Sequence, residues 1–89
     1  MDINNIFAKR LRELRKNKGL TQEKLAEMSD IDYKYLQKLE SSNPSSPTLS
    51  VLEKLSRDLG ITLTELIAYI EENKKTVIFL LVYVSLLQV

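Results

Sequence analysis

Two short helical patterns joined by a tight turn occupy residues 21–40 of this 89-residue chain, and the rest of the sequence is arranged around them. Each pattern has one apolar side at helical spacing, formed by Leu25, Ala26 and Met28 in the first and by Leu36 and Leu39 in the second. Ile31 lies in the turn beside Asp30, and aspartate tolerates a left-handed backbone better than most residues other than glycine. The pattern predicts two helices, over residues 22–29 and 32–41, that approach closely at the small side chain of Ala26.

The second of these helices carries long polar side chains on the side away from its leucines. Asp32 is placed to cap its first turn, and four side chains that donate hydrogen bonds follow on the outer face: Tyr33, Lys34, Gln37 and Lys38. A helix that is held by apolar contacts and displays donors outward is what the major groove of DNA requires of a protein. Taken alone, the same side chains fit an ordinary solvated surface better, and only a larger motif favours DNA contact.

The composition excludes several classes of site. Cysteine and histidine are absent, which rules out disulfides, thiolate chemistry, zinc fingers and catalysis by histidine. No acid pair or triad converges in the pattern, so we expect no enzyme activity, no metal and no cofactor. The polar N-terminus, MDINNIFAKR, lacks the apolar run of a signal peptide. We therefore expect a cytoplasmic protein rather than a secreted one, and contact with a membrane is not the favoured interpretation.

The net charge of +1 gives no sign of a nucleic-acid partner, but the charges are unevenly distributed. Residues 9–18 hold six basic side chains against one acid, Glu13. Such a patch would attract phosphates. From charge alone, however, a solvated helix face is the better interpretation.

Three further helices are predicted around the central pair. An apolar face with Phe7, Leu11 and Leu14 indicates a helix over residues 3–18 that ends at Gly19. A loop rich in serine and proline follows the central pair, at residues 41–48. The next helix is expected to begin with Ser46 as its cap and Pro47 at its first position, to end at Gly60, and to have these residues in the core: Leu49, Leu52, Leu55 and Leu59.

The fifth helix is expected to begin with a capping box formed by Thr62 and Glu65 and to reach about residue 73. After it, the composition changes abruptly, because eleven of the fourteen residues of the segment 76–89, TVIFLLVYVSLLQV, are apolar. The segment is shorter than the roughly 20 residues that span a bilayer as a helix, and exposed it would promote aggregation. We interpret it as an oligomerisation segment, either a strand or a helical extension.

The expected residues of this interface are Ile70, Val77, Ile78, Phe79, Leu80, Leu81, Val82 and Tyr83. The apolar composition of the segment is also compatible with packing on its own domain, with contact to a membrane or a foreign partner, and with disorder.

From about Ile6 to Ile70 the chain resembles the Cro/C1-type (XRE) helix-turn-helix family, which includes phage repressors, restriction–modification controller proteins and small bacterial regulators. The run KGLTQEKLA carries the glutamine of the family at the start of the second helix and its small residue four positions later, here Gln22 and Ala26. Leu36, Leu39 and Glu40 fit the third helix, and LGITLTEL opens the fifth. The resemblance implies an all-α, five-helix, lambda-repressor-like DNA-binding domain over residues 1–73, followed by the apolar tail 74–89.

The resemblance also assigns roles to individual residues. Contacts with base edges fall to Tyr33, Lys34, Gln37 and Lys38. Contacts with phosphates fall to Gln22, Asp32, Ser41, Asn43 and Thr48, although the carboxylate of Asp32 would repel phosphate and suits a cap better. Arg15 and Glu40 match an ion pair that ties the first helix to the third in this family.

Two departures from the family are visible. The family often has glycine in the turn or just after the third helix, where this chain has Asp30 and Ser42. The loop that follows often carries basic residues, and residues 41–48 contain none. We therefore expect modest non-specific affinity for DNA and a shallow salt dependence.

Two functions are compatible with these features. The first is a sequence-specific regulator of transcription, most simply a repressor, that binds double-stranded DNA as a homodimer on a near-palindromic operator, with the fifth helix and the tail forming the dimer. The second is a protein-interaction module, such as an antitoxin-like protein whose tail docks a partner. Selective DNA binding by the dimer separates the first function from the second.

Overall fold

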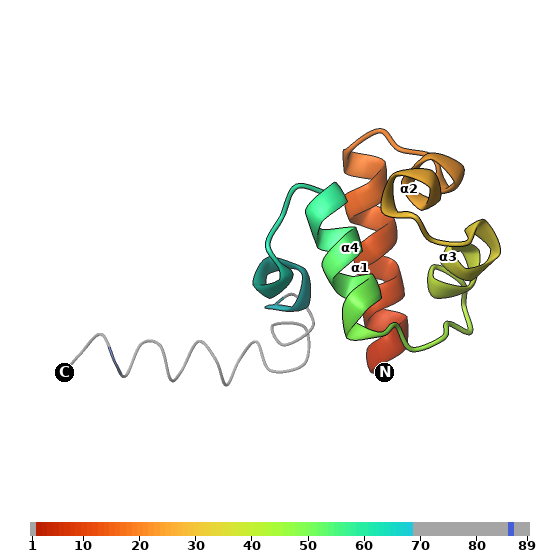
Figure 1. Ribbon diagram of the computed structural model, residues 1–89. Helices are drawn as coiled ribbons and strands as arrows, with labels where there is room; N and C mark the ends of the chain where they lie inside the picture. Colours follow the sequence, from red (N-terminus) through yellow and green to blue (C-terminus); the bar gives the residue numbers. More distant parts are fainter. Residues whose placement is uncertain (1, 69–85, 87–89) are drawn as a thin grey trace.

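The computed structural model of the protein describes residues 2–68 and residue 86. It contains, in chain order, helices α1 (Ile3–Asn17), α2 (Gln22–Ser29), α3 (Tyr33–Leu39) and α4 (Leu49–Asp58), and a further helical segment at residues 63–68. In Figure 1, α2 and α3 lie on one side of α1 and α4, and residues 63–68 lie on the other. The described residues include no strand. The predicted all-α, five-helix, lambda-repressor-like fold is confirmed.

One apolar core joins all of these helices. Every helix contributes at least one side chain that is almost completely excluded from water: Ile6, Phe7, Leu11, Leu25, Ala26, Leu36, Leu39, Leu55, Leu59 and Leu66. Burying one leucine fully contributes about 1.5–3 kcal/mol relative to leaving it exposed. The leucines at helical spacing in the sequence therefore hold α3 in a fixed place, as predicted.

Side-chain caps define where the helices begin. The side chains of Asp2, Thr21, Asp32 and Thr48 each accept a hydrogen bond from a backbone N–H in the first turn of the helix that follows. The predicted capping box is confirmed, because Thr62 Oγ1 accepts from the Glu65 N–H at 3.0 Å and Glu65 Oε1 accepts from the Thr62 N–H at 3.1 Å.

The turn between α2 and α3 has the conformation that the sequence predicted. Asp30 has a left-handed backbone, with φ 53° and ψ 49°. The Ile31 N–H donates to the Ala26 carbonyl at 2.9 Å, so the end of α2 is closed by a backbone bond. Only three residues, 30–32, then separate the two helices, and α3 is held at a fixed angle to α2.

Three details differ from the prediction. The cap of α4 is Thr48 rather than Ser46, because the Thr48 hydroxyl accepts from the Val51 N–H at 3.1 Å. Since α4 begins at Leu49, that side chain stands at the very end of the helix and is 75% exposed instead of buried. Met28 is also exposed rather than buried, at 41%, because Ser29 falls between Leu25 and Ala26 on the buried side of α2.

Candidate nucleic-acid interface

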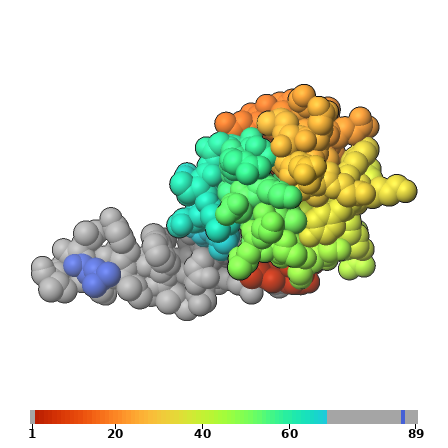
Figure 2. All heavy atoms as spheres, viewed as in Figure 1, coloured from red at the N-terminus to blue at the C-terminus, as the bar shows by residue number. Residues whose placement is uncertain are grey.

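The outer face of α3 carries the four side chains that were predicted to contact base edges. Tyr33, Lys34, Gln37 and Lys38 are all exposed, while Leu36 and Leu39 on the opposite side are completely buried. The α3 end of the molecule projects on the right in Figures 1 and 2, away from residues 63–68. The structure therefore brings these four residues together on one accessible helix face, and their contact with bases stays a prediction.

The start of α3 is fixed by Asp32. One oxygen of its carboxylate accepts from the backbone N–H groups of Lys34, at 2.7 Å, and Tyr35, at 3.3 Å. These bonds give partners to backbone N–H groups of the first turn that have none within the helix. The cap predicted for Asp32 is present, and its predicted phosphate contact stays a prediction.

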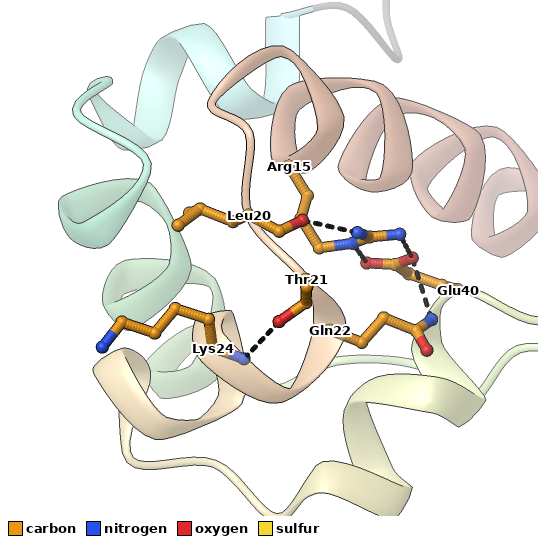
Figure 3. Close-up of polar contacts among 6 residues, drawn as sticks. All are labelled: Arg15, Leu20, Thr21, Gln22, Lys24 and Glu40. Carbon is orange, nitrogen blue, oxygen red and sulfur yellow. Dashed lines mark hydrogen bonds and ion pairs between the residues drawn. The ribbon is translucent and has the colours of Figure 1, made fainter.

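Beneath this face lies a buried ion pair between α1 and the end of α3. Arg15 Nε donates to Glu40 Oε2 at 2.8 Å and Arg15 Nη2 donates to Glu40 Oε1 at 2.9 Å, a two-point pairing. The third nitrogen of Arg15, Nη1, donates to the Leu20 carbonyl at 2.7 Å. Figure 3 shows the guanidinium between these partners. The structural ion pair that the family resemblance implied is therefore present, and it also reaches the segment that leads into α2.

Gln22, the first residue of α2, belongs to the same network. Its Nε2 donates to Glu40 Oε1 at 3.1 Å (Figure 3). The sequence suggested a phosphate contact for Gln22 but gave no sign of this bond, since the two residues are eighteen positions apart and share no local pattern. One N–H of the amide remains for a further partner, so a phosphate contact of Gln22 stays a prediction that this geometry permits.

An open hollow lies at the start of α2. It is lined by Arg15, Thr21, Gln22, Glu23 and Tyr33. The first backbone N–H groups of a helix have no partner within the helix, and they attract anions. The hollow thus connects the start of α2 with the first residue of the exposed α3 face.

The loop between α3 and α4 contains three of the residues predicted to contact phosphates, and those contacts stay predictions. The Ser41 hydroxyl donates to the Lys38 carbonyl at 2.7 Å and accepts from the Asn43 N–H at 3.3 Å. Its hydrogen is therefore engaged within the chain. The Asn43 side chain is exposed, and the Thr48 hydroxyl, which accepts from Val51, keeps its own hydrogen to donate.

The remaining predicted residues lie outside the part of the chain that the structure describes. They are Ile70, Val77, Ile78, Phe79, Leu80, Leu81, Val82 and Tyr83, and the predicted boundary at residues 73 and 74 also lies there. Within residues 2–68 and at residue 86, no helix is long and apolar enough to cross a membrane. The same residues include no group of three or more acidic, cysteine or histidine side chains that could hold a metal ion.

The likeness to known proteins agrees with this arrangement. The model of a family described as helix-turn-helix matches residues 11–66. Control protein C.MunI of a Mycoplasma species is 42% identical over 73 residues, which are 81% of this chain and 97% of the relative. The uncharacterised HTH-type transcriptional regulator y4dJ of Sinorhizobium fredii (strain NBRC 101917 / NGR234) is 33% identical over 73 residues, 82% of this chain and 94% of the relative.

Solved structures show the same relationship. The restriction-modification controller protein C.AhdI from Aeromonas hydrophila is 40% identical, with a TM-score of 0.67 over 71% of this chain and 94% of its own. The clp gene regulator ClgR from Corynebacterium glutamicum, at 20% identity and a TM-score of 0.75 over 99% of this chain and 93% of its own, shares the fold. The chain belongs to the helix-turn-helix family of DNA-binding transcriptional regulators, in the Cro/C1-type (XRE) group that its sequence resembles.

Proposed function

We propose that this protein is a sequence-specific regulator of transcription that binds double-stranded DNA as a homodimer on a near-palindromic operator. The observation that supports the proposal is the exposed face of α3, where Tyr33, Lys34, Gln37 and Lys38 stand over a fully buried pair of leucines. Long side chains that donate hydrogen bonds, on a helix that cannot rotate, suit the major groove.

The chemistry of these side chains limits which bases they can select. The Gln37 amide both donates and accepts, and this suits the N6 and N7 atoms of adenine. Lys34 and Lys38 only donate, and this suits the O6 and N7 atoms of guanine. Each well-formed two-point contact discriminates against a wrong base by about 1–3 kcal/mol.

Phosphate contacts would fix the register of α3 on the duplex. We propose that Gln22 at the start of α2, and Asn43 and Thr48 in the loop after α3, make these contacts. Because Gln22 is bonded to Glu40 at the end of α3, a phosphate held by Gln22 would be held at a fixed place relative to the exposed face. The ion pair with Arg15 ties that arrangement to α1.

A small domain with one such helix contacts only a few base pairs, so two copies on a two-fold-symmetric site are the economical way to gain specificity. In this arrangement the half-sites lie about one helical turn of DNA apart, roughly 34 Å. Occupying a promoter in this way would repress the gene behind it.

The names of two relatives support a narrower proposal. C.MunI is called a control protein and C.AhdI a restriction-modification controller protein, and both are at least 40% identical to this chain. We propose that this protein likewise controls the genes of a restriction-modification system. Footprinting on the promoters of such genes in its source genome tests this, and protection elsewhere alone would contradict it.

The general proposal is tested by selecting sites from random duplex DNA with the purified full chain at about physiological salt, where non-specific phosphate contacts weaken. We expect an enriched sequence with two-fold symmetry whose half-site spacing gives the distance between the two α3 helices. A folded, soluble protein that enriches no sequence would overturn the proposal.

A pair of substitutions then links that selectivity to α3. Replacing Gln37→Ala together with Lys38→Ala should leave the melting temperature nearly unchanged, because both side chains are exposed, and should weaken binding to the enriched site by about tenfold or more. Arg57→Ala on α4 removes one exposed positive charge and serves as the matched control. Equal losses in both proteins would mean that α3 contributes charge alone.

A further inference from the structure

An apolar groove lies at the start of α1, on a different part of the surface from the α3 face. It is lined by Ile3, Asn4, Phe7, Pro47, Leu52 and Ile67, and its volume is about 180 Å³. Asn4 is the one polar residue of this lining, and its amide donates to Ser46 Oγ at 2.8 Å. The groove therefore offers a partner mainly hydrocarbon surface.

The surroundings of the groove are apolar as well. Two of its lining side chains are exposed, Ile3 at 47% and Ile67 at 39%. The exposed Leu49 lies one helical turn before Leu52, another lining residue, on α4. Exposed apolar side chains that occur singly are ordinary, whereas several around one hollow indicate an interaction site. Because residues 63–68 and α3 lie on opposite sides of α4 in Figure 1, a partner seated here would leave the α3 face open.

The same chain contains a segment of matching chemistry. Residues 76–89 include eleven apolar side chains among fourteen, and the segment begins nine residues after Ile67. A dry apolar hollow of about 150 Å³ accommodates a benzene ring, so a groove of about 180 Å³ suits one aromatic or branched aliphatic side chain such as those at 77–84.

We propose that the groove receives the apolar segment of a second copy of this chain, and that the exchange is reciprocal. If the segment folded back onto its own groove, one or two of its side chains would be buried and the others would stay in water. In a two-fold pair, each segment covers the groove of the other copy and the two segments cover one another, and a reciprocal contact of this kind closes at two copies. The inference deepens the proposed dimer and rests on it.

Cross-linking tests which copy supplies the segment. The chain has no cysteine, so a copy with Ile67→Cys can be mixed with a copy carrying Leu80→Cys, Leu81→Cys or Val82→Cys. A disulfide between the two different variants requires their Cα atoms to come within about 7 Å. We expect at least one such pair to form this disulfide, identified by mass, much faster than pairs made with Glu27→Cys on the exposed surface of α2.

Two results would overturn the proposal. One is that, in all three pairs made with Ile67→Cys, the mixed disulfide forms no faster than in the control pairs made with Glu27→Cys. The other is a disulfide within a single chain that carries Ile67→Cys and Leu80→Cys, formed at a concentration where the protein sediments as a monomer.

Sedimentation equilibrium of groove variants provides a second measurement. Ile67→Lys or Ile3→Lys should raise the dissociation constant of the dimer about tenfold to a hundredfold, since one aliphatic contact is lost. The melting temperature of each variant should change little, because both side chains are already partly exposed. Met28→Lys is the matched control, because Met28 has a similar exposure (41%) on α2. A dimer that Met28→Lys weakens as much as Ile67→Lys does would contradict the inference. Failure of the DNA selection, by contrast, would remove the proposed function and leave these dimer measurements standing.

Discussion

Replacing Arg15 with alanine should destabilise this protein more than most single substitutions. The guanidinium donates three hydrogen bonds, two to Glu40 and one to the Leu20 carbonyl. Its side chain is 10% exposed and that of Glu40 only 1%. In Arg15→Ala, the carboxylate stays in this buried place and keeps only the bond from Gln22.

The magnitude follows from that burial. Removing one partner of a buried ion pair costs about 3–5 kcal/mol, because the other charge is left without compensation. A small domain has a total free energy of unfolding of about 5–15 kcal/mol, so Arg15→Ala removes a large share of it. At about 4–8 °C per kcal/mol for a domain of this size, the melting temperature should fall by more than about 10 °C.

Urea unfolding followed by circular dichroism measures this loss, and two further variants identify its cause. In Arg15→Met with Glu40→Leu no charge remains buried, so a substantial part of the stability should return. Gln22→Ala removes one bond to Glu40 but keeps the ion pair, and should cost about 1 kcal/mol. Breaking an exposed ion pair lowers the free energy of unfolding by less than about 1 kcal/mol. If Arg15→Ala has an effect that small, the pair is not buried in solution and the reasoning fails.

Three other predictions concern single features of the fold and the interface. Asp30→Gly should leave stability unchanged or raise it by up to about 1 kcal/mol, because φ is 53° there, whereas Asp30→Val should lower it, and thermal melts distinguish the two. Thr48→Ala removes the cap of α4 and should cost about 1 kcal/mol by the same measurement; no loss would mean that another group replaces the hydroxyl. Asn43→Lys should steepen the dependence of log K on log salt by about 0.9, and an unchanged slope would place residues 41–48 away from the phosphates.

Features set by neighbouring residues could be predicted from the sequence. The bounds of α2, the left-handed Asp30, the cap at Asp32 and the capping box at Thr62 each depend on side chains within a few positions, and the structure confirms them. The predicted start of α4 was wrong, because several residues of the loop before it can cap a helix. Ser46 and Thr48 both accept hydrogen bonds, and Pro47 suits a first helical position, so the local sequence allows either beginning.

The site was predictable to a different degree in each of its parts. Lys34, Gln37 and Lys38 follow from the period of α3, since they lie opposite the buried Leu36 and Leu39, and Tyr33 lies at the edge of the same face. The link from Gln22 to Glu40 has no such basis, because it depends on how the end of α3 meets the start of α2.

Because Glu40 holds both Arg15 and Gln22, a substitution there should affect DNA binding as well as stability. Glu40→Gln should keep a side chain of similar shape but weaken the pairing with Arg15, and the Gln22 amide would lose a charged acceptor. The control is a core variant chosen to lose the same stability, such as Leu55→Val. If Gln22 holds a phosphate, Glu40→Gln should lose more DNA affinity than this control does. A comparison of the two by DNA titration at a temperature where both are folded separates positioning from stability. Equal affinities would show that Glu40 contributes to the fold alone.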